Sequence, residues 1–403
     1  MNARLLGVLI GLVALIAPAF GFEATGTIKR VDARGGVIVV AANGADRTLR
    51  AGKDTQFLDA DGKPLRGGLA APELKEGATV TLTVEREGNA QVLKAVRLGA
   101  RTTQAATGKP SIGQKPLDEM GAQERYKGED GGLYGGGKNE PPAAHLAAAR
   151  AESAKIVPLD GEGKPSRLGM IALVSISMSN ATQEFSVFKT LADADPRTSP
   201  RVTIVDCAQG GQAMAQWVDP EGRAWTEADR RLKAATVAPE QVQVAWVKLA
   251  NVRPSGDLSE HGRKLQKDTL AVLHNAKKRF RNLRIAYLGS RIYGGWSSGE
   301  LNPEPYAYEG AFATRWLIQD QIRGDAELNY DSSRGAAKAP LLLWGPYLWA
   351  DGVTPRKSDG LVWERADVAA DGVHPTTSGR QKVAELLLAF FTRDETAKGW
   401  FAR

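Results

Sequence analysis

Residues 170–180 read MIALVSISMSN, an apolar run that ends in small polar residues. Such an unbroken run is typical of a strand that is buried on both faces of a sheet. Similar short apolar runs recur at residues 202–205, 242–247, 283–288 and 341–344. Because helical patterns separate several of these runs, the sequence predicts an α/β domain with a parallel sheet and helices on both faces.

Two of the intervening stretches have the 3.6-residue periodicity of a helix with one buried face. The first lies between the third and fourth strands and carries Leu265, Thr269, Val272, Leu273, Ala276 and Phe280. The second lies between the fourth and fifth strands and carries Phe312, Trp316, Ile318 and Ile322.

Polar or small residues follow the first three predicted strands. Ser179 comes just after the first strand, Gly211 follows the second, and Asn251 follows the third. In doubly wound sheets, sites open at the carboxyl ends of the strands. The sequence therefore predicts that these three residues meet at one edge of the sheet.

A late stretch, VAADGVHPTTSGR at residues 368–380, places Asp371 three residues before His374. A carboxylate one turn from a histidine can accept its ring N–H and fix the tautomer, so that the other ring nitrogen can take a proton from a serine. The stretch runs into a predicted last helix, which would hold this pair on a rigid element.

Each feature alone also has an ordinary structural interpretation. A serine after a strand is often a helix cap, and Gly210-Gly211 and Asp371-Gly372 are common turn pairs. Ser175 and Ser177 are rival nucleophiles, although Ser179 lies at the turn where a side chain would be exposed. The shared order at the strand ends favours the chemical interpretation.

This order of a serine, a glycine, an asparagine and a late D-x-x-H-P resembles the SGNH (GDSL-type) hydrolases over about residues 168–393. The resemblance implies a three-layer α/β/α fold with a flavodoxin-like parallel sheet. Members of the family include esterases, lipases and carbohydrate deacetylases.

By the same resemblance, Ser179 is the nucleophile, His374 is its general base and Asp371 orients the imidazole. The oxyanion hole would use the backbone N–H groups of Ser179 and Gly211 and the side-chain amide of Asn251. The match departs from the family where Gly-Asp-Ser is replaced by Ser-Met-Ser at 177–179, and where Gly-x-Asn-Asp is replaced by Leu-Ala-Asn-Val at 249–252.

Three tryptophans, Trp296, Trp349 and Trp363, fall in polar segments beyond strands. We expect them to line the substrate cleft, where indole rings stack on sugars; core packing is the alternative. The four histidines have no metal-ligand spacing, so we expect neither a metal site nor a cofactor.

The chain before this domain divides into three parts. Residues 1–21 have the basic start, apolar run and small residues of a secretory signal peptide. Residues 22–100 predict a small all-β barrel, and GTIKRVDARGGVIVV at 26–40 resembles small exported β-barrel modules of bacterial envelope proteins. Residues 101–165 are rich in Gly, Pro and Ala, which predicts a linker or a segment lying over its neighbour, before the domain at 166–403.

Composition limits the partners of the chain. A net charge of +7 over 403 residues without a concentrated basic stripe argues against nucleic acid, but is compatible with contact at an acidic envelope surface. The single cysteine, Cys207, excludes an intramolecular disulfide. We expect a secreted or periplasmic protein with no transmembrane anchor after signal removal.

The sequence thus predicts an exported serine esterase or acyl hydrolase with a Ser-His-Asp triad. Its substrate would be a small-molecule or polysaccharide ester, with the acyl group on a carbohydrate or an envelope polymer. The alternative is an SGNH-fold envelope or glycan-binding protein that has lost activity.

Overall fold

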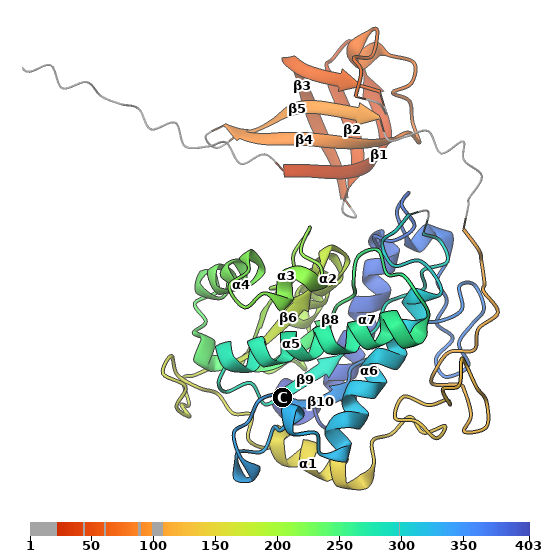
Figure 1. Cartoon of the computed structure of the whole chain (residues 1–403). Helices are drawn as coiled ribbons and strands as arrows, with labels where there is room; N and C mark the ends of the chain where they lie inside the picture. The colour runs from red at the N-terminus through yellow and green to blue at the C-terminus, as the bar shows by residue number, and fades with distance from the viewer. Residues whose placement is uncertain (1–21, 43–44, 60–61, 88–89, 99–107, 298) are drawn as a thin grey trace, which may run out of the picture. The chain divides into compact units, whose positions relative to one another are not determined.

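The computed structural model describes residues 22–42, 45–59, 62–87, 90–98, 108–297 and 299–403 (Figure 1). The predicted signal peptide, residues 1–21, lies outside this part of the chain. The chain forms two compact units, residues 1–105 and 106–403, and each is described by itself.

The first unit is a closed five-stranded barrel with the strand order β1-β2-β3-β5-β4. All neighbouring strands are antiparallel except β3 and β5. Small β-branched and aliphatic side chains such as Ile28, Val40 and Val80 fill its interior. The strands are β1 (Phe22–Asp32), β2 (Val37–Ala42), β3 (Ala45–Leu58), β4 (Thr79–Glu87) and β5 (Ala90–Leu98).

The second unit contains a five-stranded sheet in the order β10-β9-β8-β6-β7, in which every neighbouring pair is parallel. The predicted parallel sheet of a mixed α/β domain is therefore confirmed. The strands coincide closely with the five apolar runs, because most of their side chains are buried. They are β6 (Ile171–Ser177), β7 (Val202–Val205), β8 (Val242–Lys248), β9 (Ile285–Leu288) and β10 (Leu341–Trp344).

Helices cover the sheet in two groups. In Figure 1, α5 and α6 lie on the near side of the sheet and α7 lies behind it. Helix α2 packs on α7, where Phe188 stacks on Phe391, and α5 packs on α3 and α6. The helices are α1 (Ala143–Ser153), α2 (Ser179–Ala194), α3 (Met214–Val218), α4 (Arg223–Ala234), α5 (Arg263–Arg279), α6 (Tyr306–Arg323), α7 (Thr377–Arg393) and α8 (Lys398–Phe401).

From Gly108 onward the segment before this sheet belongs to the second unit. Of the two alternatives for residues 101–165, the segment lying over its neighbour therefore describes it and the linker does not; residues 101–107 lie outside the described part of the chain. Asp351 accepts hydrogen bonds from the backbone N–H groups of Ile112 (2.8 Å) and Gly113 (3.0 Å). Further along, the buried Arg315 donates to the carbonyl oxygen of Asp130 at 2.6 Å. These long-range contacts make the segment an integral layer of the second unit.

Candidate active site

Ser179 lies at the carboxyl edge of the sheet because the chain changes direction at Met178. Strand β6 is buried along its whole length and ends at Ser177. Met178 has extended backbone angles, and α2 begins at the next residue. Ser179 is thus the first residue of a helix and is partly exposed, and the N-terminal end of a helix favours negative charge that develops nearby.

The two rival serines are fully buried. The hydroxyl of Ser175 donates to Asp206 Oδ1 at 2.6 Å, and the hydroxyl of Ser177 donates to the carbonyl oxygen of Lys248. Both hydroxyls are therefore used inside the protein, whereas that of Ser179 faces an open cavity.

His374 and Asp371 complete a linear arrangement with this serine. The Oγ atom of Ser179 lies 2.7 Å from His374 Nε2, and His374 Nδ1 lies 2.6 Å from Asp371 Oδ2. Asp371 Oδ1 also accepts the backbone N–H groups of Val373 (2.9 Å) and His374 (3.0 Å). The structure thus brings together the three residues predicted for catalysis, in the order that proton transfer from serine to histidine needs; their chemical roles stay predictions.

The tight loop around this pair depends on a glycine. Gly372 has a φ of +69°, in the left-handed region, and a Cβ there would lie 1.7 Å from the carbonyl oxygen of Trp296. The backbone N–H of Ala369 donates to the carbonyl oxygen of His374 at 2.7 Å and closes the loop. The imidazole is therefore held by its own loop as well as by Asp371.

Hydrogen bonds keep the Asp371 side chain ionised. Burial raises its pKa, but hydrogen bonds from the His374 ring and from the backbone N–H groups of Val373 and His374 outweigh burial and lower the pKa to about 2. The group is therefore a carboxylate at any pH at which the protein would ordinarily work, as a histidine-orienting residue must be.

Gly211 and Asn251 line the same cavity as Ser179 and His374, with a volume of about 680 Å³. Gly211 has a φ of +71°, a conformation that residues with a Cβ rarely adopt. The carbonyl oxygen of Asn251 accepts the side-chain amide of Asn302 at 3.1 Å. Among the described residues, the side-chain amide of Asn251 has no hydrogen-bond partner, so it is available to a substrate oxygen.

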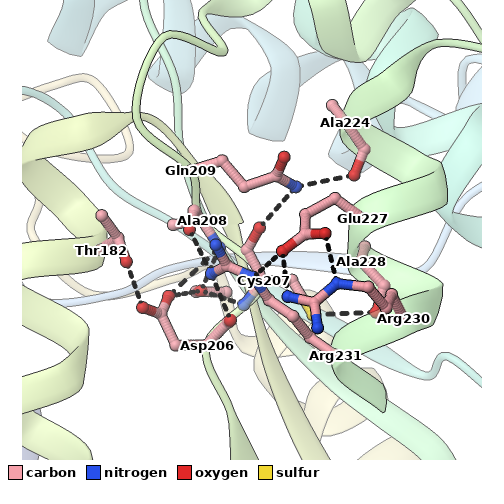
Figure 2. A network of polar contacts seen from close by, with 11 residues as sticks. Thr182, Asp206, Cys207, Ala208, Gln209, Ala224, Glu227, Ala228, Arg230 and Arg231 are labelled. Atoms are coloured by element: carbon pink, nitrogen blue, oxygen red, sulfur yellow. Dashed lines mark hydrogen bonds and ion pairs between the residues drawn. The ribbon is translucent and has the colours of Figure 1, made fainter. Parts of the chain in front are cut away.

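A polar network supports the loop that carries Gly211 (Figure 2). Arg231 donates to the carbonyl oxygens of Asp206 (2.9 Å) and Ala208 (2.7 Å). Gln209 donates to the carbonyl oxygen of Ala224 at 2.7 Å, which ties the loop to α4. These hydrogen bonds hold the loop as far as Gln209, and the chain then turns at Gly210 and Gly211, of which Gly211 lines the cavity. Sequence reasoning missed this support, although an acid directly after β7 was a visible signal.

Further polar residues line the cavity and were also missed from the sequence. Arg291 follows β9 at a strand end, which was a usable signal. The others lie in loops or at helix starts and carry no motif. They are Lys264 and the amide residues Asn180, Gln212, Gln216 and Asn302.

The three tryptophans do not line this cavity, so the prediction that they line a substrate cleft is wrong. Trp296 is 7% exposed, and Trp349 and Trp363 are fully buried. Their indole N–H groups donate to Trp363 O (2.9 Å), Glu304 Oε1 (2.8 Å) and Leu348 O (2.8 Å), respectively. Core packing, the alternative, describes them, because all three belong to the apolar core of the second unit.

Within the described residues, no group of histidine, cysteine and acidic side chains is placed to hold a metal ion. In the same part of the chain, no helix has the length and apolar character needed to span a membrane.

Comparisons with known proteins give weak likenesses. No family model and no curated protein matches the chain. Apo-CusF from Escherichia coli is 16% identical over 22% of this chain and 96% of its own, with a TM-score of 0.17. A protein from Arabidopsis thaliana is 13% identical over 51% of this chain and 65% of its own, with a TM-score of 0.30. A presumed acylhydrolase from Bacteroides fragilis is 14% identical over 62% of this chain and 96% of its own, also with a TM-score of 0.30. TM-scores this low carry no argument, so a functional assignment depends on the geometry of the site.

Proposed function

We propose that the second unit is a serine hydrolase of the SGNH type that cleaves ester bonds. The observation that carries the proposal is the chain of contacts from Ser179 through His374 to Asp371, which opens into a cavity. A hydroxyl in contact with an oriented imidazole is the arrangement that activates a serine as a nucleophile.

The strand order supports the SGNH type. Numbered along the second unit, the strands lie in the order 2-1-3-4-5, which is that of flavodoxin-like doubly wound sheets. The serine, glycine, asparagine and Asp-x-x-His positions all lie at the carboxyl edge of this sheet. The missing Gly-Asp before Ser179 is the main departure from the family pattern.

In the proposed reaction, His374 Nε2 takes the proton of Ser179 as Oγ attacks the ester carbonyl carbon. The negative charge on the carbonyl oxygen would be stabilised by the N–H groups of Ser179 and Gly211 and the amide of Asn251. The C–O bond to the alcohol then breaks, and His374 returns the proton to the leaving alcohol. Water, deprotonated by the same imidazole, then attacks the acyl carbon. The bond from this carbon to Ser179 Oγ breaks, His374 returns the proton to Oγ, and the acid leaves.

We propose an acylated carbohydrate or envelope polymer as the substrate and the periplasm or the exterior as the location. Several neutral amides line the cavity, and such groups can both donate to and accept from sugar hydroxyls. The location depends on the signal-like residues 1–21 alone.

Hydrolysis of short-chain acyl esters and acetylated glycans by wild type and Ser179→Ala tests the proposal. We expect loss of at least about 10³-fold in kcat for Ser179→Ala. Ser186→Ala is a matched control on the same helix, because its hydroxyl donates only to the carbonyl oxygen of Gln183 and is exposed. Equal rates for wild type and Ser179→Ala would remove Ser179 from the reaction, and glycan binding without any turnover would favour the non-catalytic alternative.

A further inference from the structure

Arg291 is a buried cation in the wall of the candidate active site. It follows β9, is 5% exposed, and lines the same cavity as Ser179 and His374. Its Nε atom is buried without a hydrogen-bond partner. Within the described residues, no hydrogen bond or ion pair to its guanidinium is formed. A buried charge without a direct partner is costly, so its retention needs an explanation.

The neighbouring acids do not fill this role. Glu184 forms a buried ion pair with Lys248. Glu304 accepts hydrogen bonds from two backbone N–H groups and an indole, and Asp371 binds His374. These acids lie within electrostatic reach of Arg291, yet burial is the larger effect and lowers the pKa of the guanidinium.

Another buried arginine shows the usual arrangement. Arg315 is 1% exposed, and its terminal nitrogens donate to Glu129 (2.5 Å) and to the Asp130 side chain (3.1 Å). The fold therefore supplies carboxylate partners where a buried arginine has a structural role. The Nε atom of Arg315 is also without a partner, so the two arginines differ at their terminal nitrogens: within the described residues, those of Arg291, which lines the cavity, contact no carboxylate.

Other polar atoms around the cavity also lack partners. The side-chain nitrogen of Asn180 and the side-chain oxygen of Asn302 are both buried without a hydrogen bond. Buried polar groups are almost always paired in folded proteins. Both atoms are closed off from the cavity and so do not contact an occupant; with Arg291 they show that the wall of the cavity is polar.

We propose that Arg291 binds a carboxylate of the substrate, so that the enzyme deacylates carbohydrate esters that carry a carboxylic acid, such as acylated uronic acids. This inference rests on the proposed hydrolase function. A planar guanidinium matches a carboxylate with two parallel hydrogen bonds. One carboxylate would balance the charge of Arg291. Lys264 also lines the cavity, but it is exposed and already forms an ion pair with Asp268.

The test compares two sets of substrates that differ only in charge. Mono-O-acetylated methyl glucuronosides carry the carboxylate, and the matching glucuronamides are neutral and of nearly equal size. We expect wild type to prefer the acids by about 10- to 100-fold in kcat/KM, the range that a charge-assisted hydrogen bond provides. Arg291→Gln should remove this preference by lowering kcat/KM for the acids and leaving kcat/KM for the amides unchanged. Arg291→Lys should restore part of the preference.

Arg253→Met is the matched control, because it removes a positive charge near the cavity without removing a residue that lines it. Arg253 is exposed, pairs with Glu300, and does not line the cavity. Its replacement should leave the preference unchanged. A similar loss in Arg253→Met and Arg291→Gln would refute direct binding of the carboxylate.

A binding measurement keeps the two proposals separable. Calorimetry measures binding of methyl glucuronoside to Ser179→Ala and needs no turnover. We expect Ser179→Ala to bind this ligand and Ser179→Ala/Arg291→Gln not to bind it. Circular dichroism verifies that both variants are folded. Equal rates of wild type on acids and amides, or equal binding by both variants, would overturn the carboxylate subsite and leave the hydrolase intact. Preferential binding of a sugar sulfate would also overturn it. Absence of turnover on any ester with intact binding would overturn the hydrolase proposal alone.

Discussion

Replacing Asp371 by asparagine should change which ring nitrogen of His374 carries the proton, while the shape of the site stays the same. The asparagine oxygen can keep both backbone hydrogen bonds that Asp371 Oδ1 now accepts, from Val373 and His374. Its NH₂ group then faces His374 Nδ1, which must act as an acceptor. The imidazole proton moves to Nε2, which can no longer take the proton of Ser179.

The cost of restoring the productive tautomer can be worked from these contacts. Turning the amide so that its oxygen faces His374 gives up the two backbone hydrogen bonds, at about 1 kcal/mol each. Loss of the carboxylate also removes a charge-assisted contact to the imidazolium, worth about 2 kcal/mol. The sum of about 4 kcal/mol corresponds to roughly a 10³-fold decrease in kcat.

Hydrolysis of 4-nitrophenyl acetate under substrate saturation gives this kcat directly. Asp331→Asn is the matched control, because Asp331 Oδ1 accepts the backbone N–H of Ser333 at 2.9 Å in a similar turn away from the cavity. Its kcat should equal that of wild type. A kcat for Asp371→Asn within tenfold of wild type, with an unchanged unfolding midpoint, would refute the role assigned to Asp371.

Two further predictions concern the same edge of the sheet. Asn251→Ala should lower kcat by about 10²-fold to 10³-fold with little change in KM, because an oxyanion donor acts mainly in the transition state. Steady-state kinetics on a neutral ester measures both constants. A change confined to KM would contradict the assignment of Asn251 to the oxyanion hole. In acid, Asp371 should stabilise the fold fully above its ordinary pKa of 3.8, and this contribution should be lost as the pH falls toward the folded-state pKa of about 2. Urea unfolding at about pH 5 and about pH 2.5 should therefore show a smaller difference in midpoint for Asp371→Asn than for wild type, and equal differences would contradict the assignment.

The sheet could be predicted because burial on both faces leaves a direct record in the sequence. Each strand is a short apolar run, and parallel connections bring all carboxyl ends to one edge. The same reasoning favoured Ser179 over Ser177, since the former lies past the strand end. The Asp371 and His374 pair was accessible because its geometry is local, only three residues long.

The features that the sequence did not reveal depend on the packing of the long loops. Trp349 and Trp363 have polar neighbours, and only the folded loops place them in the interior. The position of Arg291 after a strand was a signal that it lies near the site, but its lack of a partner depends on the contacts of Glu184, Glu304 and Asp371 in the folded protein. Composition also misled at Gly132, because its φ of +86° and the approach of Lys138 serve a tight turn rather than flexibility.

The packed segment that begins at Gly108 fixes where the gene can be divided. An expression fragment starting at residue 166 would remove Leu117 and Met120 from the apolar core. It would also take away the partners of Arg315 and the hydrogen bond from Tyr126 to Glu309. Such a fragment should aggregate, whereas one starting near residue 106 keeps every layer of the second unit. Exchange of the barrel for another module, in the laboratory or in evolution, is therefore compatible with this fold only upstream of Gly108.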